Sequence, residues 1–170
     1  MLKVITKLFG GSKSEKDIKK ITPLVADINR HFNSYASLSN DELRNKTQEF
    51  RKRITAHLQD IDKKIEARRA DAHQLPVEDI SGRDAIFTEV DGLRKERDQQ
   101  IEVILQQILP EAFAVVKETG RRFKENTAIE STATELDREL ATKREHISIQ
   151  GDKAIYQNSW KAAGNIVTWN

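Results

Sequence analysis

Two long stretches of the sequence carry apolar residues at intervals of three and four, and a short polar break separates them. The first stripe runs from Leu43 to Ile65 and the second from Ile86 to Ile108. This spacing places the apolar residues on one face of a helix. Two helices of similar length, joined by a short connection, can bury such faces against each other. The sequence therefore predicts a long antiparallel helical hairpin over residues 38–108, within a mostly α fold.

The composition agrees with long solvated helices rather than with a large globular core. Charged residues make up 33% of the chain and hydrophobic residues 37%, with only 7 Gly and 3 Pro among 170 residues. The net charge of +2 gives no general attraction for nucleic acid. The basic pairs Lys63-Lys64 and Arg68-Arg69 alternate with acidic residues and lack aromatic neighbours for base stacking. We therefore expect no nucleic-acid partner.

Shorter elements are predicted on both sides of the hairpin. A helix is expected over 14–37, and a short helix over 109–124 that begins at Pro110, because proline is tolerated in the first helical turn. The apolar face of this second helix is formed by Phe113, Val116, Gly120 and Phe123.

Residues 125–170 have a different character. They predict a polar helix followed by a small antiparallel β hairpin that turns at Gly151-Asp152. Trp160 and Trp169 are the only tryptophans, and we expect them to form a small core in this segment.

No catalytic, cofactor-binding or metal-binding residue is predicted. The chain has no cysteine, and its four histidines lack metal-ligand spacing. Glu135, Asp137 and Glu139 interleave with Arg138, which is typical of a solvated helix face. The stretch "GGSKS" lacks the spacing of a phosphate-binding loop.

The first residues, 1–13, predict a basic amphipathic helix. Leu2, Ile5, Leu8 and Phe9 share one face, and six lysines lie within the first twenty residues. No apolar run approaches the length that spans a bilayer, and no secretory cleavage site is evident. We expect contact with a membrane or a channel, and the alternatives are a frayed terminus or a stripe packed on the chain's own core. The predicted membrane-contact residues are Leu2, Lys3, Ile5, Lys7, Leu8 and Phe9.

Three segments, in order, resemble the N-terminal region of the SecA family of preprotein-translocating ATPases. They are "MLKVITKLFGGSKSEKDIKKI", "LSNDELRNKTQEFRKRI" and "ILPEAFAVVKETGRRF". The chain departs from the family pattern by an insertion at about 57–97, which encodes most of the hairpin, and by a second insertion after Phe123. The resemblance identifies the chain as an N-terminal fragment that ends before the motor domain.

The resemblance implies a full-length parent that uses ATP and Mg²⁺ and lies in the cytoplasm, at the inner face of the bacterial plasma membrane. Its implied partners are the SecYEG channel, anionic lipid, preprotein and the chain's own motor domain, on which 109–124 would dock. A second copy of the chain is a further candidate partner. The chain by itself is predicted to be inactive because it lacks a Walker A loop. The alternative is an autonomous helical interaction or scaffold module with no link to ATP.

Overall fold

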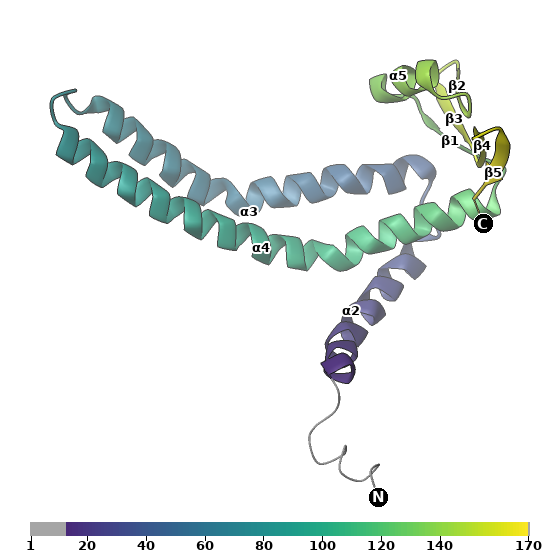
Figure 1. Cartoon of the computed structure of the whole chain (residues 1–170), viewed down its shortest axis with the longest axis horizontal. Coiled ribbons are helices and arrows are strands. Elements are labelled where there is room, and N and C mark those ends of the chain that lie inside the picture. Colours follow the sequence, from purple (N-terminus) through teal and green to yellow (C-terminus); the bar gives the residue numbers. More distant parts are fainter. Residues whose placement is uncertain (1–12, 170) are drawn as a thin grey trace, which may run out of the picture. The chain divides into compact units, whose positions relative to one another are not determined.

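The computed structural model describes residues 13–169, which are mostly helical with small antiparallel sheets near the C-terminus (Figure 1). This confirms the predicted fold class. The elements are α2 (Lys13–Tyr35), α3 (Asn40–Gln74), α4 (Ile80–Glu125), β1 (Ala128–Thr132), α5 (Glu135–Lys143), β2 (Ile147–Gln150), β3 (Lys153–Gln157), β4 (Ser159–Ala162) and β5 (Asn165–Thr168).

The chain divides into two compact units, to which α3 and α4 both contribute. One unit is Lys46–Leu109, and the other combines Met1–Asn45 with Pro110–Asn170.

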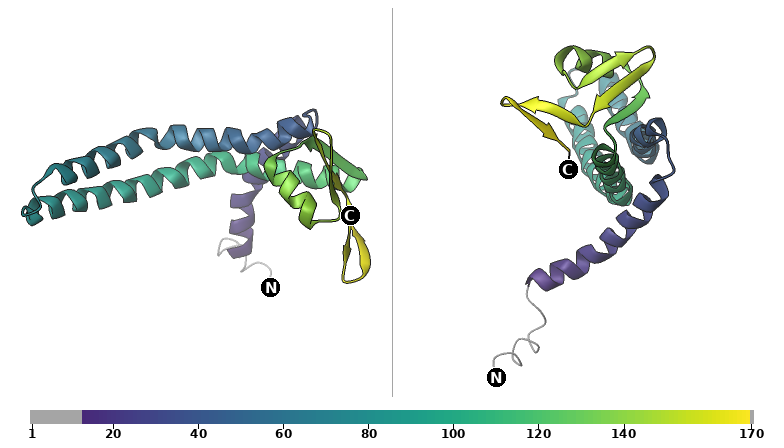
Figure 2. Two further views of the ribbon diagram at one scale, coloured as in Figure 1. Left: turned by 90° about the horizontal axis from the view of Figure 1, so that it is seen from above. Right: turned by 90° about the vertical axis from the view of Figure 1, so that its right-hand side faces the viewer.

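The unit Lys46–Leu109 is the predicted antiparallel hairpin, with its parts of α3 and α4 side by side (Figures 1 and 2). Its seam is apolar, as the two sequence stripes require. Ion pairs outside the seam join the helices, with Arg97 paired to Asp62 and Arg68 to Glu89. The buried seam residues are Leu58, Ile61, Ile65 and Val90, and Ile54, Ile86, Leu93 and Ile101 pack against them.

In the other unit, the second half of α2 packs on the last part of α4. Its buried apolar residues are Tyr35, Leu43 and Ala114, against which Ile28, Phe32, Leu38 and Val115 pack. Lys117 on α4 reinforces this contact. Its ammonium lies 4.4 Å from the centre of the Phe32 ring and 2.7 Å from the Asn29 side-chain oxygen.

Residues 109–124, for which we expected a separate short helix, are instead part of α4. The helix runs without interruption to Glu125, with Pro110 in its interior. A proline removes one intrahelical hydrogen bond. Burial of Ala114 one turn later stabilises the continuation of the helix.

The C-terminal module, defined here as residues 126–169, contains two small sheets (Figure 2). The first is antiparallel with strand order β1-β3-β2, and α5 packs against β2. Gly151 occupies the β2–β3 turn with φ +59°, a conformation that favours glycine. Strands β4 and β5 form the second sheet, where the rings of Trp160 and Trp169 lie 5.8 Å apart. Phe123 of α4 lies 5.7 Å from Trp169.

Candidate functional site

The densest group of polar contacts surrounds the first turn of α3. Ser39 begins this helix with a reciprocal capping box, since its hydroxyl accepts from the Glu42 amide at 3.2 Å and its own amide donates to the Glu42 carboxylate at 2.7 Å. We call this group the polar junction, and it comprises Asn40, Asp41, Arg44, Glu118, Arg122, Thr132, Thr134, Asp137 and Tyr156.

Arg122 of α4 closes the corner between α2 and α3. Its guanidinium donates to the carbonyls of Tyr35 at 3.1 Å and Leu38 at 2.7 Å. It also donates to the side chains of Glu118 at 2.8 Å and Asn40 at 2.7 Å. The end of a helix leaves carbonyls without intrahelical partners. The Tyr35 carbonyl at the end of α2 accepts from both the Leu38 amide and this buried cation, and the cation also binds the Leu38 carbonyl in the connection to α3.

Glu118 is fully buried and remains an acceptor for two guanidinium groups. Arg121 donates to both of its oxygens, and Arg122 donates to one. The hydrogen bonds from Arg121, followed by those from Arg122, lower the pKa of Glu118 and outweigh the opposing effect of burial.

These contacts correct the predicted apolar face of 109–124. Ala114, Glu118 and Arg122 are the buried positions, whereas Phe113 exposes 52% of its surface and Val116 exposes 69%. The backbone carbonyls at the α2–α3 corner need a donor, so a charged residue packs there in place of an apolar one.

Strand β1 is fixed to the start of α3 by three side chains. Asn40 donates to the Glu130 carbonyl at 2.8 Å, and Arg44 donates to the Thr132 carbonyl at 3.0 Å. The Asp41 carboxylate accepts from the Thr132 amide and hydroxyl, both at 2.7 Å. The hydroxyl and then the amide of Thr132 hold the pKa of Asp41 below its usual range.

Asp137 is the centre of the junction, and it corrects the prediction of a solvated acidic face. Only 1% of its surface is exposed. Arg44 donates to both of its oxygens, at 2.7 and 2.9 Å, and Tyr156 donates through its hydroxyl. Thr134, the N-cap of α5, donates its amide at 2.7 Å.

Burial raises the pKa of Asp137, but these hydrogen bonds, first those from Arg44, outweigh it and hold the pKa well below its usual range. Burial and the bond to Asp137 raise the pKa of Tyr156 to about 12. The polar groups of the junction are therefore engaged with one another, and their arrangement docks the C-terminal module on α3.

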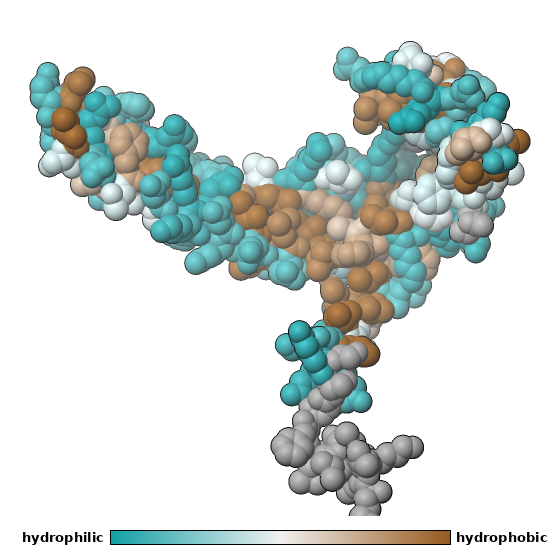
Figure 3. Space-filling view, in the orientation of Figure 1, coloured by the Kyte–Doolittle hydropathy of each residue, from teal (hydrophilic) through white to brown (hydrophobic). Residues whose placement is uncertain are grey.

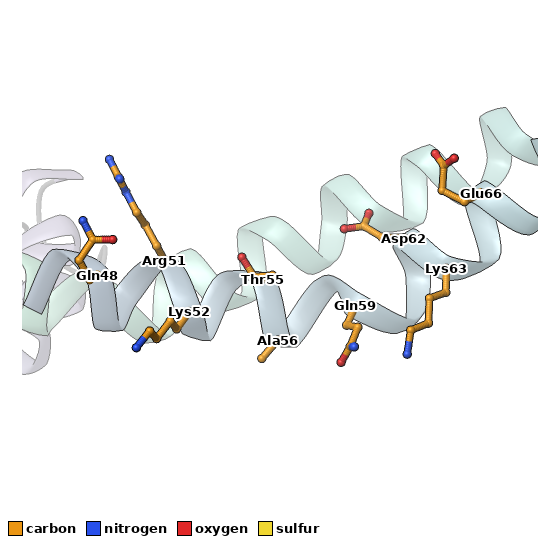
Figure 4. Close-up of a pocket in the computed structure, with 9 residues that line it drawn as sticks. All are labelled: Gln48, Arg51, Lys52, Thr55, Ala56, Gln59, Asp62, Lys63 and Glu66. Carbon is orange, nitrogen blue, oxygen red and sulfur yellow. The ribbon is translucent and has the colours of Figure 1, made fainter.

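A groove along α3 offers a second site to consider (Figure 4). All nine lining residues come from α3, they carry charges of both signs, and their side chains spread to two sides of the helix. They are Gln48, Arg51, Lys52, Thr55, Ala56, Gln59, Asp62, Lys63 and Glu66. Because the functional groups do not converge on one point, we assign no catalytic role to the groove.

The predicted membrane-contact residues Leu2, Lys3, Ile5, Lys7, Leu8 and Phe9 lie outside the described residues. Within residues 13–169, no helix combines the length and the apolar character needed to cross a membrane. The same residues contain no group of His, Asp and Glu side chains placed to hold a metal ion.

Comparison with known proteins decides the family. The family model described as "SecA DEAD-like domain" matches residues 5–134 of the chain. The chain belongs to the SecA family. It is 45% identical over 166 residues to the protein translocase subunit SecA of Flavobacterium psychrophilum, which covers 98% of the chain and 15% of that protein. For the SecA subunit of Amoebophilus asiaticus, the identity is 42% over 173 residues, covering 100% of the chain and 15% of the relative.

These SecA relatives align with the chain across both segments that we identified as insertions. A third, from Porphyromonas gingivalis, is 41% identical over 170 residues, which is 98% of the chain and 15% of that protein. The match to the family model ends at residue 134, so it does not include most of the C-terminal module. The alignments with the SecA relatives do include this module. The chain spans about 15% of the length of these relatives. No solved structure gives a significant match.

Sequence reasoning missed most of the polar junction. Asn40, Asp41 and Arg44 lie in the family-like segment 38–54, but nothing in their local pattern shows that they bind the C-terminal module. One local signal was present. Thr134 and Asp137 are three residues apart, the spacing of a capping box.

Proposed function

We propose that the chain is the N-terminal region of a SecA-type motor that uses ATP and Mg²⁺ to move preproteins through the SecYEG channel. The observation that carries this proposal is the match of 98% of the chain to translocase subunits at 45% identity. ATP binding and hydrolysis belong to the full-length parent, at the cytoplasmic face of the bacterial plasma membrane. We assign no residue of this chain to the nucleotide, because the sequence lacks a Gly-Lys-Ser or Gly-Lys-Thr loop.

Within that parent, we propose that this region packs on the rest of the polypeptide through apolar side chains that are exposed here. On α4 these are Phe113 and Val116, at 52% and 69% exposure. On α2 they are Ile18, Ile21 and Val25, at 45–60% exposure, and hydrophobic side chains are visible along this helix (Figure 3). Exposed apolar groups of this kind mark surfaces that bind another element. Relatives about seven times as long supply polypeptide to cover them.

Assembly in trans tests this packing. The chain and the remainder of its parent are expressed separately, and their association is measured by co-purification and by restored ATP-dependent preprotein transport. We expect Phe113→Asp with Val116→Asp to weaken association at least tenfold. Val103→Asp with Leu105→Asp is the matched control, because these residues expose 52% and 46% of their surface but lie in the other unit. Equal association of both variants with the remainder would refute the packing surface, and an autonomous scaffold would show no association at all.

We further propose that residues 1–9 contact an anionic membrane or the channel. Lys3 and Lys7 lie in the same segment as the short apolar stripe but off its face, and Lys13 follows the segment. Each lysine near an anionic surface contributes roughly 1 kcal/mol. A two-turn helix is unstable in water, so a lipid surface would stabilise it by burying the apolar face.

Flotation with liposomes tests the membrane contact. Binding should require anionic lipid, weaken as salt rises, and fall when residues 1–9 are deleted. A second variant replaces Leu2, Ile5, Leu8 and Phe9 by serine, which keeps every lysine and removes only the apolar stripe. Equal flotation of the deleted and intact chains would show that the membrane anchor lies elsewhere.

A further inference from the structure

The tip of the helical hairpin, residues 75–80, presents apolar side chains to solvent. Val77 and Ile80 each expose 75% of their surface, and Leu75 is half-buried. Figure 3 shows this patch as hydrophobic side chains at the end of the hairpin, bordered by hydrophilic ones. The proposed packing on the motor uses other residues, so the tip needs a separate explanation.

The exposure follows from an ordered turn rather than from a loose loop. The Asp79 amide donates to the Pro76 carbonyl at 3.1 Å, which closes a turn with Val77 at its centre. The Asp79 carboxylate then accepts from the Gly82 amide at 2.9 Å and caps α4. A Cβ at Gly82 would lie 2.4 Å from an Asp79 carboxylate oxygen, so a larger residue would displace this cap.

The hairpin's own seam does not take up these side chains. Its tip end is already filled by Ala72, which is fully buried, and Ile86 packs on the core further along. Val77 and Ile80 therefore remain outside a seam that is complete without them. Their orientation away from the seam makes them available to another molecule.

The local charge of the tip favours some binding partners over others. Glu78, Asp79 and Asp84 are opposed by Arg83 alone, so the tip is locally negative. An anionic membrane surface would be repelled by these carboxylates. A second copy of the tip would bring like charges together. The complementary ligand is one that combines apolar side chains with positive charge.

We propose that the hairpin tip binds a polypeptide segment in which an apolar stretch adjoins lysine or arginine residues. Val77 and Ile80 would contact the apolar stretch, and Glu78 would lie near the basic residues. The inference rests on the proposed function for the source of such segments, because exported preproteins begin with basic residues followed by an apolar run.

The test measures binding of a labelled peptide to the full 170-residue chain by fluorescence anisotropy. The probe has three lysines followed by eight alternating leucine and alanine residues, and the comparison peptide has three glutamates in place of the lysines. We expect the glutamate peptide to bind at least fivefold more weakly. Two tip variants are compared with the unmodified chain: the double variant Val77→Ser/Ile80→Ser and the single variant Glu78→Lys. Each should weaken binding of the lysine peptide by a similar factor.

Matched control variants lie on the shaft of α4. Val103→Ser and Glu102→Lys make the same kinds of change at exposed positions, and we expect them to alter affinity less than twofold. Helical circular dichroism confirms that each variant is folded. The proposal would be overturned if the tip variants bind the lysine peptide as tightly as the unmodified chain does, or if the unmodified chain binds the two peptides equally.

Two other results would assign the tip a different occupant and so also refute the proposal. The first is flotation with anionic vesicles that the tip variants lose, and the second is a dimer that they disrupt. Assembly with the rest of the parent and flotation through residues 1–9 depend on other residues. Failure of the tip proposal is therefore distinguishable from failure of the proposed function.

Discussion

Replacing Asp137 by asparagine should detach the C-terminal module from α3. The change removes the negative charge that faces Arg44 and turns one acceptor oxygen into a donor. Breaking a fully buried ion pair costs about 3–5 kcal/mol. The Arg44 side chain is 38% exposed and can be partly rehydrated, so we expect a loss of about 2–3 kcal/mol.

Tryptophan fluorescence during urea unfolding measures this loss, because both tryptophans lie in the C-terminal module. Circular dichroism at 222 nm follows the helices in the same samples. Glu139→Gln is the control, since Glu139 lies on the same helix and forms an exposed pair with Lys143, which should contribute less than about 1 kcal/mol. A fluorescence midpoint for Asp137→Asn that matches this control would refute the role of the polar junction.

The pH dependence of unfolding gives an independent check on the same residue. The folded pKa of Asp137 lies below its unfolded value of about 3.9. Its contribution to stability is therefore complete above that unfolded value and is lost as the pH falls toward the folded pKa. On acidification, the urea midpoint measured by fluorescence should accordingly fall less for Asp137→Asn than for the unmodified 170-residue chain.

Three further predictions concern the seam, the α2–α3 corner and the nucleotide. Ile61→Asp or Ile104→Asp buries a charge in or beside the hairpin seam and should cost about 3 kcal/mol; unchanged melting temperatures for both would contradict the seam. Arg122→Met removes the guanidinium hydrogen bonds to Glu118, to Asn40 and to the carbonyls of Tyr35 and Leu38, and it should destabilise the chain by about 3 kcal/mol. A loss under about 1 kcal/mol would show that water replaces the guanidinium. Calorimetry should detect no ATP binding to the isolated chain, and micromolar affinity would disprove this prediction.

The hairpin and the family could both be predicted from the sequence. Leu58, Ile61 and Val90 lie on stripes whose period matches the helix, and burying such stripes against each other requires only that the chain turn back between them. The position of the β turn was predictable for a similar reason, since Gly151 adopts a backbone angle that other residues disfavour. These features depend on properties of neighbouring residues, and the sequence contains that information locally.

The polar junction could not be predicted from the sequence, because tertiary structure brings its residues together. Asp137 sits among other charged residues in the sequence, and it is buried because Arg44, 93 positions away, packs against it. The same holds for 109–124, where the α2–α3 corner decides that Glu118 and Arg122 face inward while Phe113 and Val116 face solvent. Local periodicity states which residues share a helix face. Which face is buried depends on the partner that meets it, and a buried charge is stable only where that partner supplies the opposite charge and the missing hydrogen bonds.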